Sequence, residues 1–275
     1  MKFPHAPDWL VYLAVTAGLA VLAVGGPWRG APPARRLAVA TQVGGQPLEP
    51  ASLFDPAIWV SAPAAGPGAG TAFSVADSGV WLTARHVVEG CTRTVIVTGP
   101  GHGVAATVRL APGRETAILY TRGGAPALPI APAGGLRRSQ RAFHPGFPRS
   151  RPGEAASELV RRATLLVGWR GLRAEPVLTF AETARSPMTR GALTGISGAP
   201  ALDAEGRVLG VTVAEAPRRR RIYTTTPSSL RAALAQAGVV PASGLGEAMT
   251  AATYDAVADD LRARLSVAEV VCLAS

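Results

Sequence analysis

The sequence contains few cysteines and a single lysine, and it lacks glycine-rich nucleotide loops. Its two cysteines, Cys91 and Cys272, exclude a disulfide-rich scaffold and a zinc site made only of thiolates, which needs four of them. No GxGxxG or GxxxxGK(S/T) loop is present, so nothing indicates a nucleotide-binding fold. Because Lys2 is the only lysine, the net charge of +10 rests on arginine, a bias that genome composition can produce. No interleaving of aromatic and basic residues accompanies it, and we expect no nucleic-acid partner.

Hydrophobic residues and turn formers are abundant. Of the 275 residues, 48% are hydrophobic and 17% are charged, which permits a sizeable core and argues against intrinsic disorder. The 31 glycines and 24 prolines imply many turns and disfavour a helical bundle or a coiled coil. The length suits one large β domain or two small ones.

The N-terminus carries an uncharged apolar stretch at residues 9–26. A helix of roughly 17–25 such residues spans a bilayer, so we interpret residues 1–26 as a membrane anchor. A cleaved signal peptide is the alternative, although residues 22–26 match the small-x-small cleavage site poorly. Residues 27–50, with several prolines and glycines, follow as a linker. By the positive-inside rule, Arg29, Arg35 and Arg36 would place the following domain in the cytoplasm.

Beyond the linker, short strand-like runs alternate with turn residues, which is the pattern of an all-β sandwich or barrel. The runs are 58–61, 71–75, 80–83, 94–98, 104–110, 117–120, 127–130, 141–144, 159–169, 177–182, 199–202, 207–213 and 222–225. Two helices are expected after them, at 227–238 and near 247–265. We therefore place one domain at 51–238, with a C-terminal helix and strand at 239–275 packed on it.

Three segments carry residue types suited to nucleophilic catalysis. The segment 70–88 reads as two strands that lead to His86, Glu115 opens the apolar run 115–119, and Ser197 lies between glycines in 195–202. A serine hydroxyl becomes a nucleophile when an imidazole takes its proton, and the imidazole needs an acid to fix its tautomer. The glycines allow the backbone N–H groups of Gly195 and Ser197 to approach a developing oxyanion.

In this order the segments resemble the chymotrypsin-fold, trypsin-like serine proteases, and they are most similar to the bacterial Deg-type branch. The resemblance rests on Thr-x-x-His-Val-Val at 83–88, an acid opening an x-Ala-x-Leu strand at 115–119, and Gly-x-Ser-Gly at 195–198, within residues 55–237. It implies two six-stranded antiparallel β-barrels with the site in the cleft between them. It also implies His86 as general base, Ser197 as nucleophile and Glu115 as orienting acid, with the N–H groups of Gly195 and Ser197 as oxyanion hole.

Several positions depart from the family pattern. Glu115 stands where the family has aspartate, and Glu89, one turn from His86, is the rival acid. Ile196 replaces the aspartate that pairs with a newly cut N-terminus in zymogen-type members, and Ala199 replaces a glycine. These departures keep a second interpretation open, in which the chain is a catalytically inactive protease-like module that binds a protein partner.

The resemblance gives a limited view of specificity and cofactors. The family's pocket positions correspond to Gly191 and to the strand from Val211 to Ala214. No aspartate stands at the first of these positions, so a pocket for arginine or lysine lacks a counter-charge. No metal or cofactor motif is evident, and this mechanism requires none. Too few residues follow position 238 for the peptide-binding PDZ domain usual in Deg-type enzymes, so we expect none.

The two cysteines bear on localisation. If the domain is exported, a bridge between Cys91 and Cys272 would clamp the C-terminal tail beside the His86 turn; two unpaired buried thiols are the alternative. Disulfides are rare in the cytoplasm, so a bridge favours export, as does the family resemblance, against the charge bias after the apolar stretch. We expect a single-pass protein of the bacterial inner membrane, with its domain in the periplasm, that hydrolyses protein or peptide substrates through an acyl-enzyme.

Overall fold

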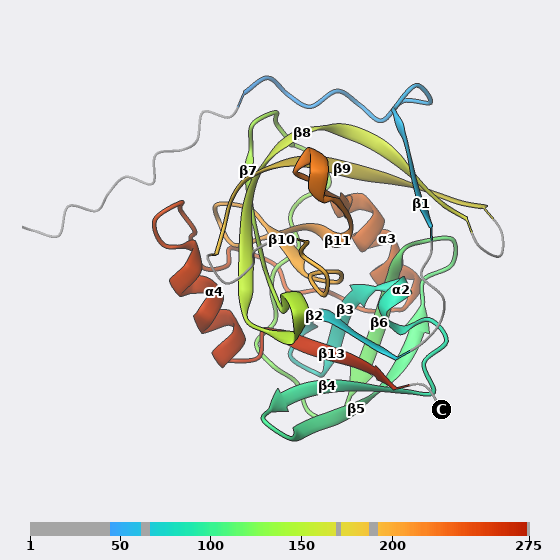
Figure 1. Ribbon diagram of the computed structural model, residues 1–275, viewed down its shortest axis with the longest axis vertical. Helices are drawn as coiled ribbons and strands as arrows, with labels where there is room; N and C mark the ends of the chain where they lie inside the picture. Colours follow the sequence, from blue (N-terminus) through green and yellow to red (C-terminus); the bar gives the residue numbers. More distant parts are fainter. Residues whose placement is uncertain (1–44, 62–66, 169–171, 187–191, 274–275) are drawn as a thin grey trace, which may run out of the picture. The chain divides into compact units, whose positions relative to one another are not determined.

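A computed structural model describes residues 45–61, 67–168, 172–186 and 192–273 (Figure 1). The expected anchor at 1–26 and most of the linker lie outside these ranges, as does Gly191. None of the helices in the described ranges combines the length and the apolar character that a membrane span requires.

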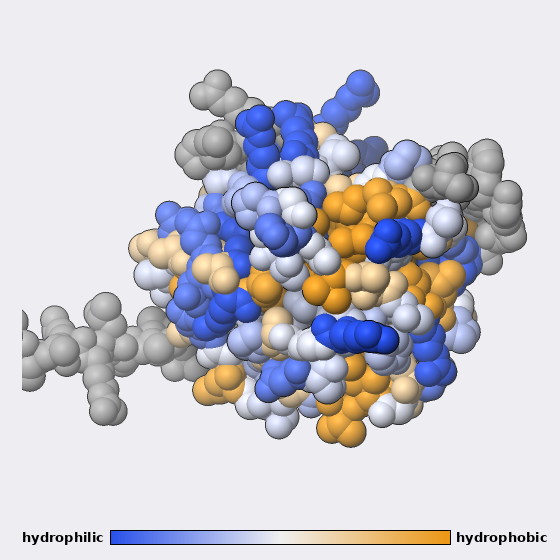
Figure 2. All heavy atoms as spheres, turned by 90° about the horizontal axis from the view of Figure 1, so that it is seen from below, coloured by the Kyte–Doolittle hydropathy of each residue, from blue (hydrophilic) through white to orange (hydrophobic). Residues whose placement is uncertain are grey.

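One part of the domain is a closed six-stranded barrel, in the order β13-β2-β3-β6-β5-β4. The strands are β2 (Gly68–Ala76), β3 (Val80–Ala84), β4 (Arg93–Gly99), β5 (His102–Leu110), β6 (Thr116–Thr121) and β13 (Val267–Leu273). The C-terminal strand β13 pairs with both β2 and β4, so it belongs to the barrel and does not merely pack on it. Each side chain of β3 is buried, whereas β5 has none that is fully buried. Figure 2 views the molecule from the side of β4 and β5, where apolar and hydrophilic side chains are mixed.

The other part of the domain is a seven-stranded sheet in the order β1-β8-β7-β10-β11-β12-β9, with a further pairing between β8 and β9. Its strands are β1 (Ala57–Ser61), β7 (Arg141–Gly146), β8 (Gly153–Gly168), β9 (Leu172–Arg185), β10 (Pro200–Leu202), β11 (Val208–Ala216) and β12 (Arg221–Thr225). The chain is therefore mostly β, as predicted. One pairing departs from the expected antiparallel arrangement, because β1 runs parallel to β8.

The helical elements are short. They are α2 (Arg85–Val88), η1 (Pro148–Ser150), η2 (Pro217–Arg219), α3 (Pro227–Gln236) and α4 (Tyr254–Ala263). The side chain of Thr226 caps α3 by accepting a hydrogen bond from the Ser229 N–H, and Pro227 occupies the first turn, where its missing N–H costs nothing. One apolar cluster includes Phe73 and Leu82 of the barrel together with Val211 of the larger sheet and Leu230 of α3. The two β structures therefore share a continuous core.

Two predicted elements are wrong. Residues 127–130 form no strand and contribute only an isolated bridge between Ile130 and Val208. Pro126, Pro129 and Pro132 lack the N–H groups that a strand ladder requires.

The last helix begins at Tyr254, not near Glu247. The segment before it is instead bound to the β10–β11 turn, because the Gly246 N–H donates to the Glu205 carbonyl and the Met249 N–H to that of Ala204.

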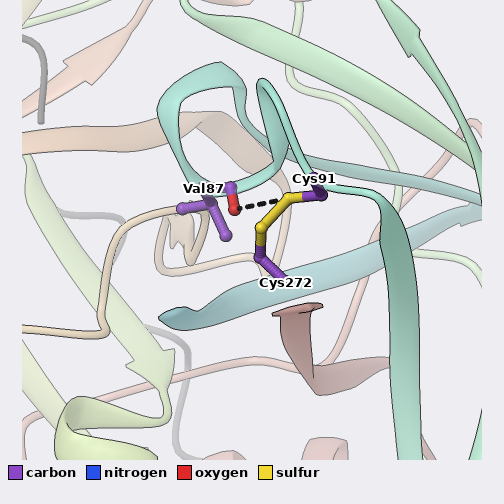
Figure 3. The surroundings of a disulfide bond; sticks show 3 residues. All are labelled: Val87, Cys91 and Cys272. Atoms are coloured by element: carbon purple, nitrogen blue, oxygen red, sulfur yellow. Dashed lines mark hydrogen bonds between the residues drawn. A yellow bond between two sulfur atoms is a disulfide. The ribbon is translucent and has the colours of Figure 1, made fainter. Parts of the chain in front are cut away.

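The predicted disulfide is present. Cys91 and Cys272 are joined across 181 positions of sequence, with their Cα atoms 5.3 Å apart. The bridge links the chain just after α2 to β13, and Cys91 Sγ lies 3.6 Å from the Val87 carbonyl oxygen (Figure 3). The helix that carries His86 is thereby held against the last strand of the barrel.

Candidate active site

The pairing of β3 with β6 brings His86 and Glu115 together. Ala84, the last residue of β3, is paired with Thr116, the first residue of β6, so the chain beyond each strand end meets the other. The Arg85 N–H donates to the Glu115 carbonyl at 2.9 Å. His86 Nδ1 lies 3.5 Å from Glu115 Oε2, with 17% of the histidine side chain exposed. A solvent-accessible imidazole therefore faces a buried carboxylate.

The Glu115 carboxylate has partners on both oxygens. Oε2 faces His86, and Oε1 accepts hydrogen bonds from Arg173 Nε at 3.1 Å and Nη2 at 2.7 Å. Burial raises the pKa of this carboxyl, but the hydrogen bonds with His86 and Arg173 outweigh burial and lower its pKa overall. Glu115 is therefore ionised at neutral pH. The rival acid Glu89 accepts instead from Arg85 Nη2 at 2.7 Å.

Ser197 lies in a tight loop before β10. Ile196 N–H donates to the Leu193 carbonyl at 2.8 Å, and Gly195 has φ +97, as the third residue of a type II turn requires. Two further bonds fix the loop between the two β structures: the Ser197 carbonyl accepts from Thr71 N–H of β2, and Gly198 N–H donates to the Thr212 carbonyl of β11, both at 2.8 Å.

The Ser197 loop and helix α2, which carries His86, meet over Gly70. A Cβ atom at Gly70 would lie 2.7 Å from Val87 Cγ1 and 2.9 Å from the Ser197 carbonyl oxygen. The residue next to His86 and the backbone of Ser197 therefore flank the same glycine, which has no room for a side chain. Among the described residues, no hydrogen bond joins the His86 ring to the Ser197 hydroxyl. Such bonds are often long in ligand-free enzymes and shorten when substrate binds.

One hydrogen bond sets the orientation of the peptide between Thr194 and Gly195. The Thr194 carbonyl accepts a hydrogen bond from the Arg149 N–H at 2.6 Å. In a trans peptide the carbonyl and the N–H point in opposite directions, so the Gly195 N–H points away from Arg149. In the described part of the chain, the N–H groups of Gly195 and Ser197 have no hydrogen-bond acceptor.

The expected pocket positions differ in exposure. Val211 on β11 is fully buried within the core, so it has no surface with which to contact a substrate. Ala214, nearer the end of the same strand, is half-buried and pairs with Tyr223 of β12. Gly191 lies outside the described residues.

A second histidine forms a hydroxyl-rich contact that the sequence analysis missed. His144 on β7 is completely buried, with Nε2 2.7 Å from Ser157 Oγ and Nδ1 3.2 Å from Thr212 Oγ1. Burial lowers its pKa to about 3, so the ring is neutral at physiological pH. With no exposed surface, this histidine cannot reach a peptide bond. Only its position inside a strand, before Pro145, could have hinted at its burial.

The described residues contain no group of three or more histidine, cysteine, aspartate or glutamate side chains able to hold a metal ion.

The fold and this arrangement of residues define a class of protein. Residues 70–211, slightly more than half of the chain, match the family model described as trypsin-like peptidase domain. The chain therefore belongs to the trypsin-like peptidase family and is a serine endopeptidase by class. A search among curated proteins finds no match.

Solved structures show the same fold. The active form of the Rv3671c protease from M. tuberculosis is 21% identical, with a TM-score of 0.51 over 72% of this chain and 96% of that one. Its inactive form is 22% identical, with a TM-score of 0.50 over 62% and 84%. The HtrA-type protease AlgW with a decapeptide also matches, at 19% identity and a TM-score of 0.48 over 62% and 53%. At these identities the first two matches support the chymotrypsin-like fold alone.

Proposed function

We propose that the protein is a membrane-anchored, exported serine endopeptidase in which Ser197 is the nucleophile, His86 the general base and Glu115 the orienting acid. The observation that carries this proposal is the approach of His86 Nδ1 to Glu115 Oε2 at 3.5 Å, beside a Ser197 loop that meets the histidine helix over Gly70.

We also propose that the larger sheet is a second six-stranded barrel. Its cyclic strand pairing, in which β8 contacts both β7 and β9, supports this.

The proposed reaction follows the serine protease sequence. His86 Nε2 takes the proton of the Ser197 hydroxyl as Oγ attacks the peptide carbonyl carbon, and the ionised Glu115 stabilises the resulting imidazolium. The N–H groups of Gly195 and Ser197 bind the oxyanion of the tetrahedral intermediate. The imidazolium then protonates the leaving amine, which leaves an acyl-enzyme that water hydrolyses by the same steps. Each group is already present, and no metal or cofactor is required.

Export and anchoring are supported by two independent observations. The uncharged apolar stretch at 9–26 has the composition of a membrane span, and the Cys91–Cys272 bridge suits an oxidising compartment. We therefore place the domain in the bacterial periplasm. Fractionation of cells that express the full chain tests this: we expect the protein in the inner-membrane fraction, with protease sensitivity only after the outer membrane is opened. Protection until the inner membrane is also broken would refute export.

The alternative is an inactive module that binds a protein partner. It is favoured by the lack of a hydrogen bond between His86 and Ser197 and by glutamate at the acid position. A fluorophosphonate probe separates the two functions, because it bonds only to an activated serine hydroxyl. We expect the full-length protein to be labelled and Ser197→Ala not to be, whereas Ser78→Ala, in an exposed turn, should label normally. Folded wild-type protein that resists the probe would favour the module.

A further inference from the structure

Two side chains of β9 bind the proposed catalytic acid from the opposite β structure. Arg173 donates to the Glu115 carboxylate through two nitrogens, and Glu175 Oε2 accepts from the Glu115 N–H at 2.6 Å. Residues two apart on a strand point to the same face, which is why both reach one residue. Glu115 precedes β6 of the closed barrel, whereas β9 belongs to the larger sheet. The start of β9 therefore reaches across the interface between the two β structures.

The contacts from β9 give the two oxygens of the Glu115 carboxylate different partners. Glu115 is only 2% exposed, and a buried carboxylate without partners is strongly disfavoured. Arg173 occupies Oε1 with a two-nitrogen contact, so Oε2 is the oxygen left to face His86. A planar guanidinium fixes the direction of the carboxylate as well as its charge. A neutral side chain at position 173 would leave Oε1 unbound and the carboxylate free to rotate.

The charges around this carboxylate come from α2, from β9, and from the segments that follow α2 and precede β6. His86 and Arg85 lie on α2, and Arg85 and Arg173 both contact Glu89 just beyond it, at 2.7 and 3.6 Å. Arg114 Nη1 precedes β6 and lies 4.0 Å from Glu175 Oε1. Burial raises the pKa of Glu175, so this second acid adds less negative charge than its proximity implies. Of the three arginines, Arg173 is the one whose side chain bonds to the Glu115 carboxylate within the described residues.

We propose that Arg173 is a positioning residue for catalysis: from the start of β9 it aligns the Glu115 carboxylate with His86 and partly neutralises the charge of that carboxylate. This inference rests on the proposed roles of Ser197, His86 and Glu115. It extends the site beyond the three segments that the sequence motifs mark, into a strand that carries no motif. It also makes the geometry of the acid depend on the packing of one β structure against the other.

Arg173→Gln tests the proposal, with the rate of fluorophosphonate labelling of the full-length protein as readout. A hydrogen bond to a charged group contributes about 1.5–3 kcal/mol, so we expect a loss of about tenfold or more in the limiting labelling rate. The concentration of probe at half-maximal rate should not change, since Arg173 does not touch the probe. Arg161→Gln removes the same charge from the exposed face of β8 and should label at the wild-type rate. Arg173→Lys should recover part of the loss, because lysine keeps the charge without the two-nitrogen contact.

The pH dependence gives a readout that a purely structural role would not change. The Arg173 cation helps to lower the pKa of Glu115, and a protonated Glu115 could not stabilise the imidazolium that the reaction forms. Removal of the cation should therefore shift the acid limb of the rate profile to higher pH, while Arg161→Gln leaves that limb in place. Unchanged rate and acid limb in folded Arg173→Gln would overturn the proposal. If this variant does not fold, Arg173→Lys supplies the same comparison.

A double-mutant cycle shows whether Arg173 acts through Glu115. In a Glu115→Gln background, Arg173→Gln should cause no further loss, whereas an additive loss would overturn the proposal. The proposed function is judged separately. If Ser197→Ala is still labelled, the catalytic assignment fails. If Ser197→Ala is unlabelled while Arg173→Gln behaves as wild type, only the positioning role fails.

Discussion

The two histidines in the domain's interior regions make an informative comparison. The helix that carries His86 meets the Ser197 loop over Gly70, and the ring of His144 contacts Ser157 and Thr212. His86 is partly exposed and faces the carboxylate of Glu115, whereas His144 is fully buried and contacts only hydroxyl groups. The residue types are similar, but the surroundings differ in two properties: access to solvent and a nearby opposite charge.

This difference decides what each ring can do. A general base must accept a proton, and the positive imidazolium that results needs a partner of opposite charge. His86 has such a partner in Glu115, whose lowered pKa keeps it ionised. His144 has none, and burial holds its pKa near 3, so protonation would place an uncompensated charge in the core. A histidine beside a serine is therefore insufficient evidence of a catalytic pair.

The largest expected contrast is in activity. Replacing His86 by alanine should lower the hydrolysis or labelling rate by about 10⁴-fold or more, as loss of a catalytic triad member does. His144→Leu should keep the rate close to wild type in protein that remains folded, because the buried ring does not reach the substrate. Equal losses in the two variants, with both folded by circular dichroism, would remove the distinction between the two sites.

A smaller contrast concerns the disulfide beside His86. Replacing both Cys91 and Cys272 by serine opens a loop of 181 positions, which the chain-entropy model values at about 3–5 kcal/mol of unfolding free energy. Urea denaturation of the oxidised wild type and of the double variant measures this loss. The serine variant should be insensitive to dithiothreitol. If dithiothreitol does not change the urea midpoint of the wild type either, the bridge does not contribute to the free energy of unfolding.

The smallest expected effect is the pH dependence that His144 adds to stability. Its pKa is about 3 in the folded chain against an ordinary value of 6.5, so the unfolded chain binds the proton first as pH falls. This contribution to stability is complete above pH 6.5 and declines towards pH 3. Between pH 6 and pH 4.5, wild type should lose about 2 kcal/mol more than His144→Leu. Parallel losses in urea titrations of the two proteins would mean that His144 is protonated when folded.

Much of the fold could be predicted because its strands are short and separated by turn residues. The first barrel illustrates this: β2, β3, β4, β5 and β6 each match a predicted run to within a few residues. The pairing of the cysteines was also accessible, since two cysteines allow one intramolecular bridge. The strand predicted at 127–130 is wrong because its residues are apolar, as in a strand, but the prolines in and around it prevent a ladder.

The surroundings of the site were less accessible from sequence. His86 and Glu115 lie at the ends of two paired strands, and each stands in a short motif. Arg173 is 58 positions beyond Glu115 and stands in no motif, because its role depends on how one β structure packs against the other. The burial of His144 is likewise a property of three strands together. Local patterns predict strands and loops, but they do not predict which distant side chain meets a buried charge.

The place of β13 has a consequence for biosynthesis. Residues 267–273 fill the gap between β2 and β4, so the barrel beside His86 cannot close until these residues have left the ribosome. Until then the edges of β2 and β4 that face β13 stay unpaired, and the Cys91–Cys272 bridge beside α2 cannot form. A chain that stops before residue 267 should therefore lack the closed barrel on which the position of His86 depends.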